Sequence, residues 1–487
     1  MKLHDIFQVS FDFFKSKPVI VEPVEAQLSS DAGLLPIREF DQRIGFSEQF
    51  ADALHDLRRT ASVEHPFEEM FRSRLFGILA DYEDQNDHDV LRSDPVFKLI
   101  AGRSPDDGDL ASQPTLSRFE NAIDIRSFWR LRDVLIDRFI ASFDAPPARL
   151  TFDVDCFDDP AHGQQQLIMF HGFYNQYQYL PRAITCAEND LTVMVCLLFG
   201  TANPALGIDD DLEYLSQRLR AVWPDVEIHL RADSGFATPI TYNACERLDL
   251  FYTLGLRMNP VLKRASASLL NKALTTYESE GESQRLFESF WYRAGSWPHE
   301  RFVVIKAEAN AQGTNRRAVL TNRPGAMILP EACYDAYADR GESENRNKEF
   351  KCEFRADRLS DHRYLANLFR LYLHIAAANL LVLLRREIAA PPRAPHPPLD
   401  APEPLPVEAL PGQRRRDYYN RRRQHDPLGE GHACTWRTRL IKVAAQVVVR
   451  ARCIRVRLSG CWPYLDHFQQ VSQAALQVPS QIRLSPD

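Results

Sequence analysis

The apolar residues change their spacing near residue 148, and this change constrains the fold more than any other feature of the chain. Before it, apolar residues recur every three or four positions, as in 40–57 and 67–79, which predicts helices. After it they alternate with polar residues, which predicts a strand with one apolar face: Leu150, Phe152, Val154 and Cys156. The opposite face of this strand carries two carboxylates, Asp153 and Asp155.

The segments that follow predict an α/β fold with a mixed sheet flanked by helices. Strand-like runs occur at 166–170, 191–199, 226–232 and 250–256, and a helical segment lies at 211–222. Residues 285–322 predict a small antiparallel insertion, and long helices are expected at 334–355 and 364–386. We therefore expect a helical N-terminal domain at 1–145 and an α/β domain at 146–388, with a β-rich insertion at about 260–330.

One helix start in the N-terminal domain has a local signal. In the segment 113–121, Ser117 is expected to cap a helix and Glu120, three residues later, to complete a capping box. This domain has two possible roles, reading DNA ends or covering the α/β domain.

The C-terminal part of the chain is rich first in proline and then in arginine. Nine of the 31 prolines lie between residues 391 and 411, which predicts a semi-rigid linker at 389–412. The net charge of the chain is −7, yet residues 411–460 hold thirteen basic and three acidic residues, a local charge of +10. Two arginine triplets flank Tyr418 and Tyr419: Arg414, Arg415, Arg416, Arg421, Arg422 and Arg423. Residues 413–487 are therefore expected to form a basic region that contacts phosphates, the alternative being a solvated charge run.

Cysteine usage and hydropathy bound the class of protein. The nine cysteines are scattered and form no Cys-x-x-Cys pair, which argues against a disulfide framework and a zinc ribbon. The first residues have no uninterrupted apolar stretch, and the apolar run 371–384 is short for a membrane span and interrupted by His374 and Asn379. We expect a soluble cytoplasmic protein with no membrane partner.

Carboxylates at strand ends predict a metal site. Asp233 follows the strand-like run 226–232 directly, and Gly235 permits a tight turn that would face this carboxylate toward a crevice. Asp153 and Asp155 are candidates on the first strand, and Asp155 is preferred because it lies nearer the carboxyl end. Hard oxygen ligands that converge on two divalent ions are what phosphodiester cleavage requires.

A polar stripe on the helix expected at 334–355 provides the third carboxylate. Tyr337, Arg340, Glu344 and Lys351 are separated by three, four and seven residues, which places all four within roughly 60° of arc. A helix that only covers a core would carry apolar residues there. Glu344 could complete the metal site while Arg340 and Lys351 hold a phosphate. An ion pair on a solvated face is the alternative interpretation.

These residues resemble the signature of the DDE transposases of bacterial insertion sequences, which Tyr337, Arg340, Glu344 and Lys351 match in full. The similarity extends to the group called the thirteen-eighty family through these segments: Asp153-Val-Asp, Asp159-Pro-Ala-His-Gly-Gln-Gln, Arg231-Ala-Asp-Ser-Gly-Phe, Asp357-Arg-Leu-Ser and Ala366-Asn-Leu-Phe-Arg. The family often has Thr where this chain has Phe157, which leaves Asp153 open beside Asp155.

The resemblance implies an RNase-H-like core that cuts and transfers DNA strands. It implies that Asp155, Asp233 and Glu344 bind two Mg²⁺ or Mn²⁺ ions, and that Tyr337, Arg340 and Lys351 assist at the phosphate. The implied partners are double-stranded DNA, as terminal inverted repeats and target DNA, and a second copy of the chain. In similar transposases an aromatic residue of the insertion stabilises a flipped base, and the candidates by location are Trp291 and Trp297. Two other functions fit the same residues: a catalytically inactive DNA-binding descendant and an RNase-H-like nuclease.

Overall fold

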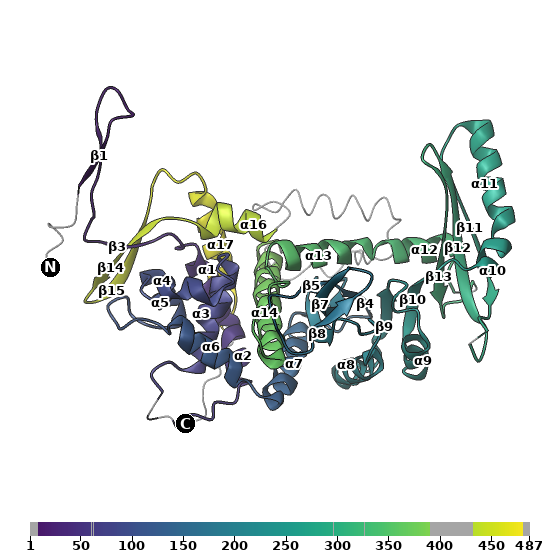
Figure 1. Ribbon diagram of the computed structural model, residues 1–487, viewed down its shortest axis with the longest axis horizontal. Coiled ribbons are helices and arrows are strands. Elements are labelled where there is room, and N and C mark those ends of the chain that lie inside the picture. Colours follow the sequence, from purple (N-terminus) through teal and green to yellow (C-terminus); the bar gives the residue numbers. More distant parts are fainter. Residues whose placement is uncertain are drawn as a thin grey trace, which may run out of the picture.

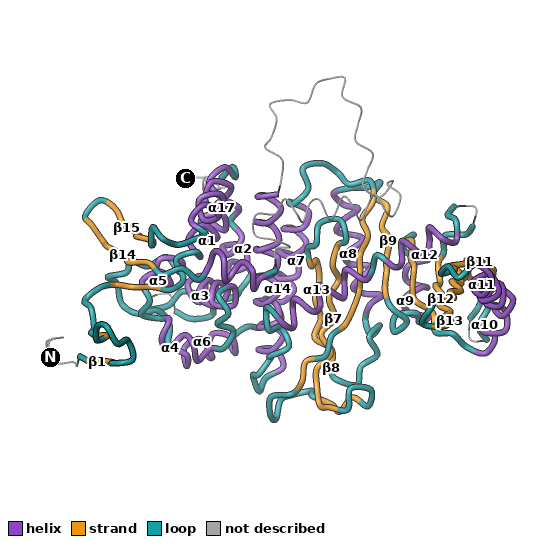
Figure 2. Tube along the Cα trace, turned by 90° about the horizontal axis from the view of Figure 1, so that it is seen from above, coloured by secondary structure: helices purple, strands orange, loops and turns teal. Residues whose placement is uncertain are grey.

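The structure is a computed structural model that describes residues 8–480, except residues 60, 62, 296, 326 and 390–431. Seen from above, the described parts form a row, with helices at one end, strands in the middle and a β-rich insertion at the other end (Figure 2). In side view the long helix α14 (Tyr364–Ala389) stands between the N-terminal helices and the sheet (Figure 1). The six arginines of the predicted phosphate-binding triplets lie outside the described residues.

Residues 34–140 form helices, as their apolar spacing predicts. The helix α3 (Phe67–Leu79) is buried along almost its whole length at the centre of this part. Local signals set the ends of α5 (Pro95–Ala101): the side chain of Asp94 accepts hydrogen bonds from two first-turn amides, and Gly102 ends the helix at φ 99°. The remaining elements are α1 (Leu34–Ile44), α2 (Phe46–Asp52), η3 (Gln85–Asp87), α4 (His88–Leu91), α6 (Gln113–Ala122) and α7 (Ile125–Ile140).

The start of α6 differs from the sequence-based prediction. Ser112 is at its N-cap, so Ser117 lies inside the helix and the predicted capping box is wrong. The carboxylate of Glu120 is instead buried and accepts hydrogen bonds from Nε of Arg74, at 2.8 Å, and from Nε of Arg370, at 2.6 Å. Two buried guanidinium groups attract this carboxylate more strongly than a helix-end amide does, because charge-assisted bonds strengthen when water is excluded.

The central sheet is built on β4 (Arg149–Cys156), and its alternation matches the prediction. Leu150, Phe152 and Val154 belong to a buried cluster together with residues of α7 and of two further helices, whereas Asp153 and Asp155 lie on the opposite face. The other core strands and the two helices are β7 (Gln176–Cys186), β8 (Thr192–Phe199), β9 (Glu227–Ala232), β10 (Phe251–Leu256), α8 (Ile208–Val222) and α9 (Pro239–Arg247).

The pairing of these strands is mixed, which confirms the expected α/β class with a large mixed sheet. β4 lies between β7, which is antiparallel to it, and β9, which is parallel to it. β10 continues the parallel side, and β8 pairs antiparallel with β7. The short strands β5 (Asp159–Pro160) and β6 (Met169–His171) also pair with β7.

The strand β7 is a neighbour of β4 that the sequence analysis missed. It spans eleven residues and includes Pro181 and Arg182 in its middle. A proline cannot donate to the strand ladder, and a charged residue breaks an apolar run, so both argue against a central strand. The structure accommodates Arg182 by burying it, because its guanidinium donates to the main-chain carbonyls of Pro204 and Leu206 and to the carboxylate of Asp211.

The expected β-rich insertion is present, but it is not a separate sheet. Its strands are antiparallel, and Thr321 of the last strand pairs with Thr253 of β10, so the insertion extends the central sheet to ten strands. The helix α11 (Ala267–Glu280) packs against all three of its strands, and together they form the part that rises at one end of the molecule (Figure 1). The other elements are α10 (Pro260–Ala265), β11 (Gln284–Tyr292), β12 (Arg301–Asn310) and β13 (Gly313–Thr321).

The helix expected at 334–355 is divided into α12 (Pro330–Ala338) and α13 (Gly341–Cys352), with Arg340 at the junction. Figure 1 shows the two in sequence, running across the top of the sheet from the insertion to α14. Within the described residues, α14 is the one helix that is long and apolar enough to cross a membrane by length and composition. Of its most apolar window, 83% is buried inside the protein, which is typical of a core helix.

The described C-terminal residues pack on the N-terminal helices. They form α16 (Ala433–Trp436), the π-helical turn η5 (Arg437–Ile441), β14 (Ala445–Arg450), β15 (Cys453–Leu458) and α17 (Leu465–Gln477). β14 pairs with β3 (Gln27–Ser29), and Trp436 is fully buried in the same core cluster as the N-terminal helices. The described part of the expected C-terminal region is thus joined to the N-terminal part. The strands β1 (Val9–Phe11) and β2 (Val19–Val21) form a hairpin that projects away from the body (Figure 1).

Candidate active site

Asp155 and Asp233 lie side by side at the carboxyl ends of two parallel strands. Val154 of β4 is in register with Ala232 of β9, so the residue that follows each of them carries one of the two carboxylates. The amide of Cys156 donates a hydrogen bond to Oδ1 of Asp155 at 2.9 Å. The amide of Gly235 donates to Oδ1 of Asp233 at 2.8 Å, in the tight turn that the glycine was expected to allow. The strand ends therefore bring together two carboxylates that are 78 positions apart in the chain.

Asp153 has a different environment from Asp155. Its two carboxylate oxygens accept hydrogen bonds from Nε and Nη2 of Arg231, both at 2.8 Å, and both side chains are buried. Nη1 of the same guanidinium donates to the carbonyl of Ala336 in α12, at 2.8 Å. Asp153 thus anchors α12 to the sheet through Arg231, whereas Asp155 faces the open end of the strands.

The four residues of the polar stripe all contact the region around these carboxylates. Arg340 is central, because its Nη2 donates to Oε1 of Glu344 at 2.7 Å and its Nη1 lies 3.5 Å from Oδ2 of Asp155. The guanidinium carbon lies 5.7 Å from the ring centre of Tyr337. Lys351 donates to Oδ1 of Asp158 at 2.5 Å, just beyond β4. The division of the helix at Arg340 does not separate these side chains.

A glycine in β10 makes room for Tyr337. A Cβ atom on Gly255 would lie 2.5 Å from the hydroxyl oxygen of Tyr337 and 3.1 Å from the amide nitrogen of Ser234. This position borders both the turn after Asp233 and the start of the polar stripe. Any larger residue would displace one of them, since real Cβ contacts do not approach so closely.

The electrostatics of the site favour a cation. Burial raises the pKa of Asp155 to about 6; the guanidinium of Arg340 opposes this shift, and the carboxylates of Asp233 and Glu344 add to it. Burial also raises the pKa of Tyr337, again opposed by Arg340. Both shifts come chiefly from burial, and for Asp155 the neighbouring carboxylates add to it, so a divalent cation would offset the cost of keeping these carboxylates charged.

Three carboxylates form a hard donor set that fits divalent ions such as Mg²⁺. Glu344 has the freedom to adjust, because its side chain is 64% exposed and forms an ion pair with Arg340. Within the described part of the chain, only Glu349, Glu353 and His432 bring one ligand atom each within 4.8 Å of one another. The three predicted ligands stand further apart, with Arg340 bridging Asp155 and Glu344.

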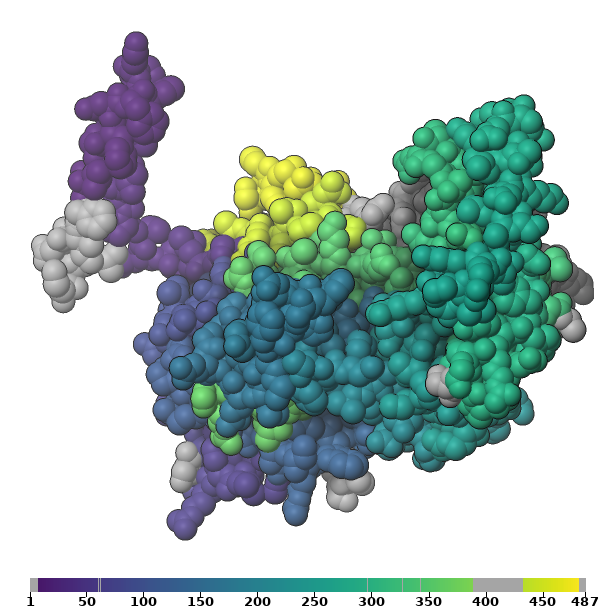
Figure 3. Space-filling model, turned by 45° about the vertical axis from the view of Figure 1, so that its right-hand side comes forward, coloured from purple at the N-terminus to yellow at the C-terminus, as the bar shows by residue number. Residues whose placement is uncertain are grey.

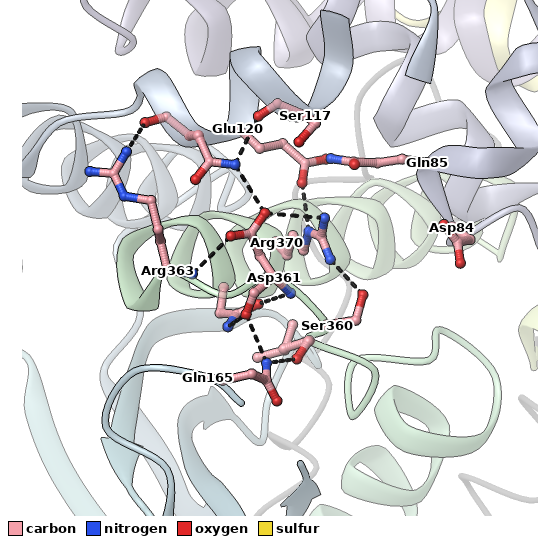
Figure 4. A network of polar contacts seen from close by, with 12 residues as sticks. Asp84, Gln85, Ser117, Glu120, Gln165, Ser360, Asp361, Arg363 and Arg370 are labelled. Atoms are coloured by element: carbon pink, nitrogen blue, oxygen red, sulfur yellow. Dashed lines mark hydrogen bonds and ion pairs between the residues drawn. The ribbon is translucent and has the colours of Figure 1, made fainter. Parts of the chain in front are cut away.

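A polar network joins the loops beside the site to the N-terminal helices (Figure 4). The side-chain amide of Gln165 donates to the main-chain carbonyls of Leu359 and Asp361, at 2.5 and 2.9 Å. Arg370 donates to Glu120 at 2.6 Å and to the hydroxyl of Ser360 at 2.8 Å. The segments 159–165 and 357–360, which carry part of the family resemblance, therefore meet in space, and the buried Glu120 connects them to α6.

The two tryptophans considered for base stacking are placed differently. Trp297 is buried against Tyr242 of α9 and Tyr292, with the guanidinium of Arg301 5.4 Å from its ring centre, so it is a core residue where the insertion meets the central sheet. Trp291 is exposed and contacts the ring of Phe302 at 5.5 Å. The sequence analysis did not single out Asp158. This residue lies two positions beyond the end of β4, and its carboxylate accepts a hydrogen bond from Lys351.

Comparison with known proteins identifies one family along most of the chain. The family described as transposase DDE domain group 1 matches residues 11–394. A similar solved structure is that of the piggyBac transposase synaptic complex with hairpin DNA, with 15% identity, 73% of this chain and 75% of that chain covered, and a TM-score of 0.39. No curated protein matches the sequence.

Proposed function

We propose that this chain, which belongs to the family of transposases with a DDE domain of group 1, cuts DNA at the ends of an insertion sequence and transfers the strands to target DNA. The observation that carries the proposal is the grouping at the carboxyl ends of β4 and β9. Asp155 and Asp233 follow paired residues there, and Arg340 contacts both Asp155 and Glu344.

Each residue of this grouping has a role that its position supports. Asp155, Asp233 and Glu344 would hold two Mg²⁺ or Mn²⁺ ions, the first two from rigid strand ends and the third from an exposed helix. When bound, such ions activate a water or a 3′-hydroxyl and stabilise the leaving oxygen. Arg340 and Lys351 would bind phosphate oxygens, and Tyr337 would orient the guanidinium of Arg340.

The finer assignment follows the sequence signature. Tyr337, Arg340, Glu344 and Lys351 match the thirteen-eighty group of insertion-sequence transposases, whose core is RNase-H-like. The DNA partners would be terminal inverted repeats and target DNA, contacted also by the N-terminal helices and by the arginine triplets at 414–416 and 421–423. The protein would act in the bacterial cytoplasm as a homodimer on paired ends.

A cleavage assay on the flanking DNA tests the proposal. The DNA on both sides of the gene is sequenced for inverted repeats, and an end-labelled duplex carrying one repeat is incubated with protein and Mg²⁺. The unaltered chain is expected to cut at the repeat end. Glu344→Gln should lose cutting by about 1,000-fold or more while still binding the duplex. Glu331→Gln, an exposed residue of α12, is the matched control and should cut normally.

The same assay separates the other two functions. If the unaltered chain binds the repeat but does not cut it, the protein is a catalytically inactive DNA-binding descendant. If it cuts duplexes with and without the repeat equally well, it is an RNase-H-like nuclease. Either result contradicts the proposal.

A further inference from the structure

A short hairpin beside the candidate site exposes an unusual number of large apolar side chains. Residues 167–177, here called the aromatic hairpin, comprise β6, a turn and the start of β7. Phe173 is 85% exposed and Tyr177 is 61% exposed. The other exposed members are Leu167, Met169, Phe170 and Tyr174. Single exposed apolar side chains are common on protein surfaces. A contiguous group of them usually marks a binding surface.

Contacts within the aromatic hairpin connect its rings and close its turn. Phe170 pairs with Tyr177 across the two strands, with ring centres 5.5 Å apart, and the rings of Phe173 and Tyr174 are 5.1 Å apart. The turn closes through a hydrogen bond from the amide of Asn175, at φ 54°, to the carbonyl of residue 171. These contacts place the rings side by side on the hairpin, and a surface that is already arranged lowers the entropy cost of binding.

The end of β8 fixes the base of the hairpin. A Cβ atom on Gly200 would lie 2.2 Å from the carbonyl oxygen of Gln178 and 2.4 Å from that of Met169, so only glycine allows this close approach. The hydroxyl of Thr201 lies 3.2 Å from the sulfur of Met169. Both strands of the hairpin thus rest on β8, which is part of the central sheet.

The hairpin extends from the same end of the sheet as the carboxylates. Ala183 of β7 pairs with Asp155, and β7 runs back from there to the hairpin, so Tyr177 lies at most about 20 Å further along the strand. Gln176 donates to Oδ2 of Asp158 at 3.1 Å, and Asp158 in turn binds Lys351. Burial raises the pKa of the Tyr174 hydroxyl, and nearby carboxylates including Asp158 and Asp155 raise it further.

We propose that the aromatic hairpin is a stacking platform for unpaired DNA bases within about six nucleotides of the phosphate that is cut. Every base has a π-face, so exposed rings bind single-stranded DNA without reading its sequence. The inference rests on the proposed function, because it is the DNA at the carboxylates that brings bases to Phe173 and Tyr177. In this proposal the hairpin contacts the bases of the DNA strand and does not bind the metal ions.

The surroundings favour nucleic acid over a protein partner. The hairpin is linked through Gln176 and Asp158 to Lys351, which would bind a phosphate, and its other polar side chains are Asn175 and His171. Figure 3 shows the blue central part and the teal insertion side by side on one face of the molecule.

Binding measured without cutting tests the platform. Two duplexes of one arbitrary sequence are compared, one fully paired and one with its last six nucleotides unpaired, the latter carrying 2-aminopurine in the unpaired segment. Ca²⁺ replaces Mg²⁺ so that affinity is measured without cleavage. We expect the unaltered chain to prefer the frayed duplex and to quench 2-aminopurine. Phe173→Ala with Tyr177→Ala should weaken frayed-duplex binding by roughly 5- to 100-fold, with little effect on the paired duplex.

Control variants separate stacking from folding and from association. Phe173→Trp should keep the preference and the quenching, because it keeps a ring, whereas Phe173→Leu should not. Trp129→Ala, an exposed aromatic of α7 remote from the site, should behave as the unaltered chain. If the double variant binds both duplexes as the unaltered chain does, or if it changes the oligomeric state in sedimentation instead, the platform is wrong. Glu344→Gln should keep the frayed-duplex preference, so loss of cutting and loss of stacking are read separately.

Discussion

Replacing Glu120 by Gln should destabilise the protein more than any exposed Glu to Gln change. The carboxylate of Glu120 is fully buried between Arg74 of α3 and Arg370 of α14, whose side chains are themselves almost completely buried. Glutamine has nearly the same shape and can accept one of the two hydrogen bonds. It cannot supply the negative charge, so Arg74 would lose its counterion, and Arg370 would keep only the more distant carboxylate of Asp361, at 3.7 Å.

Two independent estimates give the size of the effect. Removing one partner of a buried ion pair costs about 3–5 kcal/mol, because the remaining charge is desolvated without compensation. Burial alone would raise the pKa of Glu120, but Arg370 and Arg74 outweigh burial and lower it to about 2. The ordinary value in that comparison is 4.5, and the difference corresponds to about 3 kcal/mol of stability above pH 4.5, which is lost as the pH falls toward 2.

A thermal unfolding experiment checks this prediction. For a folding unit of about 150–250 residues, a loss of about 3–5 kcal/mol corresponds to a decrease in Tm of roughly 6 to 20 °C. The control is Glu48→Gln on α2, which is exposed and should change stability by less than about 0.5 kcal/mol. The difference in Tm between the two variants should also narrow below pH 4, because Glu120 of the control then begins to be protonated and loses its stabilising charge. If both variants unfold at the same temperature at pH 7, the buried triad does not hold α3 and α14 together as argued.

Three other outcomes follow from the structure. Gly33→Ala should weaken the packing of residues 432–480, because the added methyl would lie 1.8 Å from a main-chain carbonyl oxygen of η5. We expect faster hydrogen exchange of the β14 amides, and unchanged exchange would contradict this prediction. His88 and His374 are buried and neutral, each with its pKa lowered to about 3 mainly by burial, so these two side chains should together contribute about 3 kcal/mol less to the free energy of unfolding in urea at pH 5.5 than at pH 7.5, a difference that should vanish when both are replaced by Gln. Asp155→Asn should abolish cutting without lowering Tm, whereas Asp153→Asn should lower Tm by several degrees, since it leaves a buried arginine unpaired; the opposite pattern would make residue 153 the ligand.

The parts of the fold that could be predicted are those fixed by local pattern. The alternation of Leu150, Phe152 and Val154 gave the right strand with the right face, and the glycine after Asp233 gave the right turn. The polar stripe on α12 and α13 was visible because its spacing contradicts a core-facing helix. In each case a few neighbouring residues determine the structure, so no information from elsewhere in the chain was needed.

The parts that could not be predicted depend on partners distant in sequence. The strand β7 tolerates Arg182 only because the carbonyls of residues 204 and 206 and the carboxylate of Asp211 surround its guanidinium. Glu120 left its expected cap because Arg370, 250 positions away, binds it in the core. The pairing of β14 with β3 joins residues more than 400 positions apart. None of these contacts has a signature in the local sequence, since each side chain is ordinary until its partner is known.

In the candidate site, too, the sequence signature does not show which side chains Arg340 contacts. Its guanidinium bridges Asp155 and Glu344, so it acts there as the cation between two carboxylates. Glu344 cannot serve Arg340 and a metal ion with the same oxygen. An ion pair with so exposed a carboxylate contributes at most about 1 kcal/mol, so its loss would weaken ion binding by no more than roughly fivefold. The guanidinium released from Glu344 would lie beside the ions, and its N–H donors would be free to bind a phosphate. The site without ions and DNA would therefore already hold Asp155, Arg340 and Glu344 close to the positions that cleavage requires.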